Sequence, residues 1–343
     1  MKIRFALLLL FPPILIASTL MGGYRLLKNI PLTGDGTYWD YMAVDEGARR
    51  LYVSHDTKLD VIDLDSEKAV GEVSDLGRVH GTAIAPKLGR GFVSSGGLNK
   101  VTIFDLKTLK HISEVPAGEN PDGILYESVT GRVFAFNKRG DSVTVFNASD
   151  GTLVKTVELG GGPEFPVSDA QGNVWTNLEN KSTLIRMDAR TLAVTGRWPV
   201  DPCEGPSSMA IDRKHRRLFI GCNNEHVGSP MMAVADPDSG KILTTVPIGI
   251  HVDATVYEPS TGLIFNANNG SVTVVHQDSP DKYSVVETVE TQFKANTMAL
   301  DPKTHKIYLS TAEFGPAPAA TPETPHPARP MLLGTFKVLV LGR

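Results

Sequence analysis

The sequence predicts an all-β protein: a seven-bladed β-propeller built from four-stranded antiparallel blades. A β-hairpin pattern recurs seven times at intervals of 40 to 46 residues, and a fixed interval of this length is typical of repeat architectures. A further strand-turn-strand pattern follows the hairpins, so each repeat holds four short strands. The strands are nearly continuous apolar runs, which favours sheets packed on both faces and leaves no room for helices between them.

The hairpin is clearest in residues 209–222, where Met-Ala-Ile-Asp leads through a charged turn to Arg-Leu-Phe-Ile. Similar sequences occupy residues 42–53 and 298–309, and weaker copies lie between them. The equivalent turn positions are Asp45, Ala85, Glu127, Asp169, Asp212, Glu258 and Asp301. Acidic side chains favour such turns because they accept hydrogen bonds from the backbone a few residues on.

The outer half of each repeat is an apolar strand, a turn rich in Asp, Ser, Pro or Gly, and a fourth strand; residues 101–106 begin one example. The last repeat has strands within residues 296–310 and 336–341 but no fourth strand before Arg343. Residues 24–32 have no hairpin before them and resemble the fourth strands elsewhere. We therefore expect this N-terminal strand to join the last blade and close the ring, which removes an open sheet edge.

The first 23 residues differ in composition from the rest. Lys2 and Arg4 precede an apolar run at residues 5–21 that is broken by two prolines and followed by small residues. This pattern predicts a secretory signal peptide, and the alternative is an uncleaved membrane anchor. We expect residues 24–343 to form a single periplasmic or secreted domain that contacts a membrane only through an uncleaved N-terminal segment.

Composition and cysteines limit the partners. Hydrophobic residues make up 41% and charged residues 21% of the chain, and the net charge is −4 with no basic block. These values exclude a nucleic-acid partner, which needs clustered Lys and Arg, and a monomer is expected. Cys203 and Cys222 lie in one repeat, and in an exported protein such a pair predicts a disulfide. Two free thiols or a metal-binding pair are the alternatives.

The repeats resemble the YVTN, or YncE-like, seven-bladed β-propeller proteins of bacterial exported space. The resemblance covers residues 24–343 and depends on Leu51-Tyr52-Val53-Ser54, on the Asp-turn-Lys/Arg-Ile/Leu-Tyr/Phe pattern, and on Gly-x-x-Pro loops such as residues 118–121. It implies the fold and an exported location. It does not imply one function, because this group serves several roles.

One polar residue begins the innermost strand of each repeat, five residues before the turn position. The seven residues are Asp40, His80, Asp122, Glu164, Ser207, Asp253 and Asn296, and Trp39, Glu204 and His251 lie close to them in sequence. Repeat symmetry should gather this set around one mouth of the central channel. The sequence therefore predicts a ligand-binding site formed by residues that are far apart in the chain.

Carboxylates and imidazoles in one place predict a site for a cation, a metal ion or a polar small molecule. Ca²⁺ and Mg²⁺ prefer carboxylate oxygens, and Zn²⁺ also accepts imidazole. The possible metal ligands are Asp40, His80, Asp122, Glu164 and Asp253. The alternative is a solvated polar funnel, because channel mouths are wet, and the ring is wide enough that one ion would touch no more than three members.

Three functions remain open. The first is a non-catalytic exported protein that binds a small molecule, a metal ion or a protein on the channel-mouth face. The second is a divalent-metal-dependent hydrolase or lyase, as in the propeller lactonases and streptogramin lyases that this fold resembles, with His80 or His251 as general base. The third is an accessory to a periplasmic redox system. The nucleophile-elbow, His-Glu-x-x-His and phosphate-loop motifs are absent from the sequence.

A proline-rich loop at residues 314–333 interrupts the last repeat. Such a sequence is extended and forms no core of its own. Its position predicts either a segment that covers part of the channel mouth or contacts a partner, or a disordered insertion.

Overall fold

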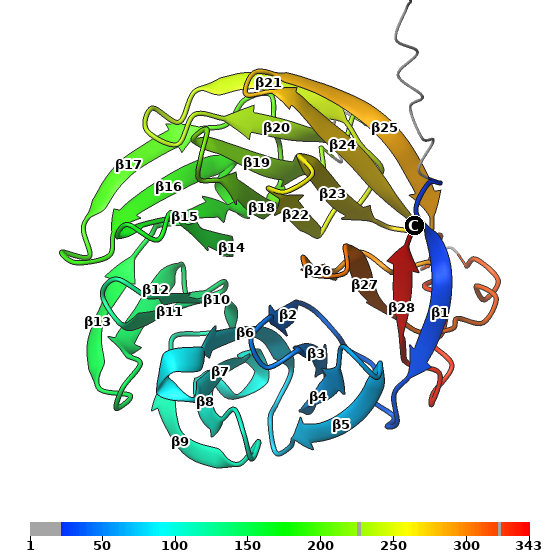
Figure 1. The fold of residues 1–343 in the computed structure, drawn as a ribbon, viewed down its shortest axis with the longest axis horizontal. Coiled ribbons are helices and arrows are strands. Elements are labelled where there is room, and N and C mark those ends of the chain that lie inside the picture. Colours follow the sequence, from blue (N-terminus) through cyan, green and yellow to red (C-terminus); the bar gives the residue numbers. More distant parts are fainter. Residues whose placement is uncertain (1–21, 225–227, 322–323) are drawn as a thin grey trace, which may run out of the picture.

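Seven four-stranded antiparallel sheets form a ring around a central axis (Figure 1). The computed structural model describes residues 22–224, 228–321 and 324–343, so most of the predicted signal segment lies outside the described residues. The arrangement confirms the predicted seven-bladed propeller. No helix within the described ranges is long and apolar enough to cross a membrane. Helical structure there is limited to three short 3-10 turns, η1 (Pro86–Leu88), η2 (Gly96–Leu98) and η3 (Glu179–Lys181).

In the first six blades the strands run outward from the channel in chain order. Blade 1 consists of β2 (Met42–Asp45), β3 (Arg50–His55), β4 (Lys58–Asp63) and β5 (Lys68–Val73), and blade 2 of β6 (Val79–Ala85), β7 (Arg90–Ser95), β8 (Lys100–Asp105) and β9 (His111–Pro116). Blade 3 consists of β10 (Pro121–Glu127), β11 (Arg132–Asn137), β12 (Ser142–Asn147) and β13 (Leu153–Glu158), and blade 4 of β14 (Pro163–Ser168), β15 (Asn173–Leu178), β16 (Thr183–Asp188) and β17 (Val194–Pro199). Blade 5 consists of β18 (Pro206–Asp212), β19 (Arg217–Cys222), β20 (Met231–Ala235) and β21 (Ile242–Pro247), and blade 6 of β22 (Ala254–Glu258), β23 (Leu263–Asn268), β24 (Ser271–Ser279) and β25 (Lys282–Glu290).

Blade 7 combines both ends of the described chain. It consists of β26 (Met298–Asp301), β27 (Lys306–Thr311), β28 (Lys337–Gly342) and, outermost, β1 (Arg25–Pro31). Strand β1 pairs antiparallel with β28, with Ile30 opposite Val338, and the two strands lie side by side in Figure 1. The predicted closure by the N-terminal strand is therefore confirmed.

The acidic turn positions act as side-chain caps of the inner hairpins. Asp212 Oδ1 accepts hydrogen bonds from the backbone N–H groups of Lys214 and His215, at 3.0 and 3.1 Å. Blade 2 has Ala85 at the equivalent position, where no such bond is possible, and η1 replaces the capped turn. Gly89 ends η1 with φ 63°, a conformation that glycine adopts without steric cost. One repeat thus departs from the acidic pattern because a different turn does the same task.

Seven apolar clusters form the core, one between each pair of neighbouring blades. Phe92 and Phe146, for example, pack between blades 2 and 3 with ring centroids 5.9 Å apart. Each fully buried side chain of this kind contributes about 1.5–3 kcal/mol relative to an exposed one. The inner strands are apolar on both faces because each blade is covered on both sides, whereas outermost strands such as β1, β5 and β9 are exposed along most of their length.

Basic side chains also link neighbouring blades on the face of the ring that carries the inner hairpin turns. An arginine at the start of the second strand donates to a backbone carbonyl in the outer turn of the next blade. The pairs are Arg50 with Leu106, Arg90 with Ala148, Arg132 with Ala189, and Arg217 with Pro280. The recurring Arg or Lys before the Leu/Ile-Tyr/Phe pattern therefore has a structural role.

The two cysteines form the predicted disulfide. It joins the loop before β18 to the end of β19, with the Cα atoms of Cys203 and Cys222 5.3 Å apart and both side chains buried. Antiparallel pairing of β18 with β19 brings the two positions to one end of blade 5.

Candidate functional site

Of the residues predicted to begin the inner strands, Asp40, Asp253 and Asn296 lie just before their strands, and the others lie where the regular strand pairing is interrupted. Pairing of β6 with β7 passes from Val79–Ser95 directly to Thr82–Val93, so His80 lies at an irregularity in the ladder. Asp122 lies at the same kind of irregularity between β10 and β11. Such bulges turn side chains out of the regular alternation. Here they occur at the end of the strand nearest the channel mouth.

Serine hydroxyls on the second strands fix the backbone at these positions. The N–H of Asp40 donates to Ser54 Oγ at 2.6 Å. Ser94 Oγ accepts from the N–H of Gly81 at 2.8 Å and donates to the carbonyl oxygen of Asp122 at 2.6 Å. Neighbouring inner strands also approach closely, because a Cβ on Gly81 would lie 3.2 Å from that same oxygen. The backbone is therefore tied across two blades beside the side chains of interest.

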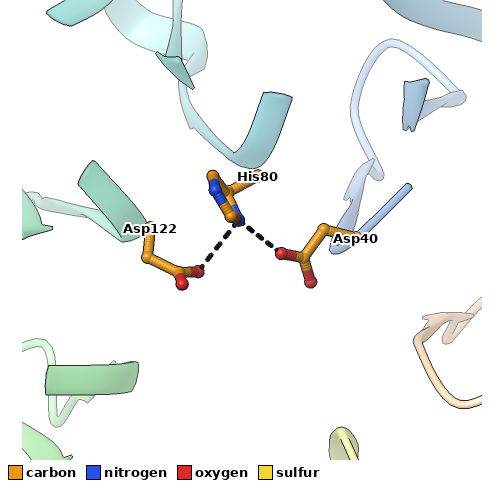
Figure 2. A group of neighbouring side chains, drawn as sticks. All are labelled: Asp40, His80 and Asp122. Atoms are coloured by element: carbon orange, nitrogen blue, oxygen red, sulfur yellow. Dashed lines mark hydrogen bonds and ion pairs between the residues drawn. The ribbon is translucent and has the colours of Figure 1, made fainter. Parts of the chain in front are cut away.

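Asp40, His80 and Asp122 point toward one another from blades 1, 2 and 3 (Figure 2). His80 Nδ1 lies 2.6 Å from Asp40 Oδ2 and 3.5 Å from Asp122 Oδ1. The Tyr38 hydroxyl donates to Asp40 Oδ2 at 2.8 Å and also lies 2.8 Å from His80 Nδ1. One nitrogen and two carboxylate oxygens of this buried triad lie within 4.8 Å of one another. Asp122 Oδ1 is buried and has no hydrogen-bond partner among the described residues.

Burial and charge shift the protonation of the triad. Burial disfavours the imidazolium form of His80, but the Asp122 and Asp40 carboxylates outweigh it and raise the pKa of His80. Burial raises the pKa of Asp122 to about 6, although His80 acts in the opposite direction. The two carboxylates therefore favour the imidazolium form of His80.

A second group of buried acids lies on the other side of the channel mouth. Glu164 accepts a hydrogen bond from the Tyr41 hydroxyl at 3.0 Å and forms an ion pair with Lys138. Burial, together with the Asp122 charge, raises the pKa of Glu164 well above its usual value. Asp253 accepts a hydrogen bond from Asn296 Nδ2 at 3.2 Å, and burial followed by repulsion from Asp40 raises the pKa of Asp253 to about 8.

Both acidic groups line one cavity of about 450 Å³ at the channel mouth. Of the residues predicted from sequence, the cavity is lined by Trp39, Asp40, His80, Asp122, Glu164, Asp253 and Asn296. Glu204, Ser207 and His251 do not line it. The Ser207 hydroxyl instead donates to the Val252 carbonyl at 2.6 Å, and the side chain of His251 is exposed. The structure thus gathers most of the predicted ring but not all of it.

Sequence reasoning missed several lining residues. Tyr38 and Tyr41 flank Asp40, and the local sequence Tyr-Trp-Asp-Tyr was an available signal for both. Four basic residues also line the cavity, namely Arg78, Lys138, Arg139 and Lys294. They lie in connecting loops. Arg78 and Lys294 share one repeat position, two residues before His80 and Asn296, but Tyr38, Asn120 and Gly162 at the equivalent positions are not basic, so no repeated charge marked them.

The proline-rich loop reaches the edge of the cavity through Phe314, which is one of the lining residues. The Phe314 ring lies 6.2 Å from the Trp39 ring and 5.1 Å from the Phe293 ring, and Phe314 forms an isolated bridge with Met331. Arg329 donates to the carbonyl oxygens of Gly315 and Phe314. The described ends of the loop are therefore attached to the channel-mouth face.

Comparison with known proteins identifies the class by fold. No protein-family model and no curated protein matches the sequence. Solved structures do match. A chain of the Kuenenia stuttgartiensis hydrazine synthase has a TM-score of 0.71 at 13% identity, with 81% of this chain and 94% of that chain covered. The WD40 repeats of RRP9 have a TM-score of 0.73 at 9% identity, covering 93% and 97%, and U3-55K has 0.71 at 9%, covering 92% and 98%. At these identities the likeness shows the seven-bladed propeller fold alone.

Proposed function

We propose that this propeller is a binding protein that holds a ligand at the channel mouth, and that a divalent cation bound by Asp40, His80 and Asp122 is its first ligand. The observation that carries the proposal is the convergence of one imidazole nitrogen and two carboxylate oxygens within 4.8 Å on the wall of a cavity. The buried Asp122 Oδ1, which has no hydrogen-bond partner among the described residues, fits a cation ligand. This donor set suits Zn²⁺ or Mn²⁺, since one of its members is imidazole.

The cation would take the place of the proton on His80 Nδ1. Metal ligation by imidazole requires the neutral ring, so protons compete with the metal. The pKa of His80 is raised above that of ordinary imidazole, because the two carboxylates outweigh the effect of burial. The competition therefore extends to higher pH than usual, and metal affinity should rise between pH 6 and pH 8.

Titration calorimetry of the purified protein with Mn²⁺ and Zn²⁺ tests the proposal. We expect saturable binding at one site, stronger at pH 8 than at pH 6. Asp122→Asn and His80→Gln should each weaken binding by more than about tenfold, because each removes a ligand or its charge. Circular dichroism checks that both variants fold.

Asp253→Asn is the matched control. It changes a buried carboxyl in the same cavity that is not part of the triad, and it should change metal affinity by less than about threefold. Absence of binding to the wild-type protein, or equal losses in all three variants, would contradict a cation site at Asp40, His80 and Asp122.

A metal-dependent hydrolase or lyase is the second candidate. One observation favours it: Asp253 lines the same cavity and has a pKa of about 8, raised by burial and by Asp40, so it can gain or lose a proton near neutral pH. Turnover of a lactone panel by the Mn²⁺-loaded protein, lost in Asp253→Asn with metal binding retained, would support it.

We also propose that the chain is exported and belongs with the YVTN, YncE-like propellers. Support for the family comes from the Leu51–Ser54 sequence and the repeated hairpin pattern. The Cys203–Cys222 disulfide supports export, because disulfides persist in oxidising compartments. Fractionation of expressing cells, with N-terminal sequencing of the mature chain, tests both the location and the cleavage of the signal.

A further inference from the structure

Basic side chains from three connecting loops surround the acidic cavity. Arg78 precedes β6, Lys138 and Arg139 lie between β11 and β12, and Lys294 lies between β25 and β26. Lys138 already forms ion pairs with Glu164 and Glu179. Among the residues that the structure describes, no carboxylate lies within ion-pair distance of Arg78, Arg139 or Lys294. Arg78, Arg139 and Lys294 therefore line the cavity without a direct ion pair to any described residue.

The acidic side chains of the cavity wall do not outnumber the basic ones. Four carboxyl groups line it, from Asp40, Asp122, Glu164 and Asp253, and four basic side chains line it, from Arg78, Lys138, Arg139 and Lys294. A divalent cation at the triad would add two positive charges without removing any of the basic residues. The loaded cavity would thus carry excess positive charge, which favours an anion.

The rest of the wall indicates what kind of anion fits. Trp39, Tyr41 and Phe314 supply aromatic surface to the cavity. The Arg78 guanidinium lies 4.0 Å above the Tyr38 ring, which holds it beside the triad while leaving its N–H donors available. Guanidinium groups bind carboxylate and phosphate oxygens in a bidentate manner. A volume of about 450 Å³ is within the range of small-metabolite pockets.

We infer that the channel mouth binds a small organic anion, a carboxylate or phosphate ester, that contacts both the bound cation and the rim arginines and lysine. This inference rests on the proposed cation site. The anion's oxygens would meet the cation on one side and Arg78, Arg139 and Lys294 on the other. Its carbon skeleton would lie against the aromatic wall.

The experiment uses malate and glycerol 3-phosphate as probes, because both chelate metals too weakly to remove the ion from the protein. Each is titrated by calorimetry into the metal-free and the Mn²⁺-loaded protein. We expect at least one probe to bind the loaded protein about tenfold more tightly than the metal-free protein, since the ion supplies a direct charge contact. The better probe distinguishes a carboxylate ligand from a phosphate ester.

Variants of the rim then separate this inference from the cation site. Arg139→Gln combined with Lys294→Gln should weaken binding of the better probe by about fivefold or more while Mn²⁺ affinity stays within about twofold. Lys214→Gln is the matched control, because it removes one charge from an exposed residue in the β18–β19 turn on the opposite face. It should change neither affinity.

If Mn²⁺ binds but both probes bind the rim variant as tightly as the wild type, the anion site is wrong and the cation site stands. If Mn²⁺ itself does not bind, both inferences are wrong. The metal titration, read separately from the anion titration, tells the two failures apart.

Discussion

His80 is held from both sides by groups that determine its orientation. On the cavity side, Nδ1 faces the Asp40 and Asp122 carboxylates. On the other side, the buried Nε2 atom has no hydrogen-bond partner among the described residues, and it lies against Gly96. The imidazole can therefore keep this orientation only because residue 96 is a glycine, which has no side chain.

Gly96→Ala tests this packing at the scale of one residue. An added Cβ would lie 2.5 Å from His80 Nε2 and 2.6 Å from Asn120 Oδ1, closer than real Cβ contacts allow. The ring must shift, so we expect Mn²⁺ affinity to fall by about tenfold, as for other displaced metal ligands. Calorimetric titration of the variant measures the change.

Gly47→Ala is the control for this substitution. Its Cβ would meet only Asp45 Oδ1, at an ordinary 3.5 Å, in the β2–β3 turn on the opposite face. It should leave Mn²⁺ affinity unchanged. Wild-type affinity in Gly96→Ala would show that the His80 orientation does not matter for cation binding.

At the scale of the strand, the repeat explains what the sequence could predict. Positions five residues before the hairpin turns lie at the same mouth of the channel in different blades, so counting back from the turns places Asp40, His80 and Asp122 in one cavity. Glu204 and His251 lie in loops between blades and do not line the cavity. The basic side chains of the rim could not be predicted from the repeat, because their charge does not recur at equivalent positions. The ion pairs and pKa shifts could not be predicted from the sequence, because they depend on which side chains of different blades contact one another in the folded ring.

The arginines that start the second strands give a prediction about blade-to-blade attachment. Arg132 Nη1 donates to the carbonyl oxygens of Ala189 and Arg190 in the next blade, both at 2.8 Å. Arg132→Met keeps the aliphatic part of the side chain but removes both hydrogen bonds. We expect the free energy of unfolding to fall by about 1–2 kcal/mol, measured by urea denaturation.

Lys155→Met is the comparison for Arg132→Met, because Lys155 is exposed on the outermost strand β13 and has no side-chain hydrogen bond or ion pair among the described residues. Its loss should change the free energy of unfolding by less than about 0.5 kcal/mol. Equal effects of the two substitutions would mean that the inter-blade hydrogen bonds contribute no net stability.

At the scale of the whole molecule, the ring depends on the junction between blades 7 and 1. Strand β1 completes blade 7, and ion pairs cross from that blade to blade 1. Arg49 of blade 1 forms two hydrogen bonds with the buried Asp301 carboxylate, at 2.6 and 2.7 Å. Lys306 and Lys28 of blade 7 both pair with Glu67 of blade 1. The Arg49–Asp301 and Lys306–Glu67 contacts join residues more than 200 positions apart, so they hold the ring closed rather than stabilising a single blade.

Asp301→Asn tests the junction, and its effect should depend on pH. Burial alone would raise the pKa of Asp301, but hydrogen bonds from Arg49 and Thr304 outweigh it and lower the pKa to about 2. An unfolded Asp carboxyl has a pKa of about 3.9. A pKa lowered by folding stabilises the protein fully above the unfolded value and progressively less as the pH falls toward the folded value. We therefore expect Asp301→Asn to cost about 1–2 kcal/mol at pH 7, and the difference from wild type to shrink between about pH 4 and pH 2. Urea denaturation across that range measures it.

Asp65→Asn changes the exposed partner of the same Arg49 and should cost less than about 0.5 kcal/mol. A cost for Asp65→Asn equal to that for Asp301→Asn, or a difference for Asp301→Asn that does not vary below pH 4, would show that the buried ion pair does not hold the two ends of the ring together.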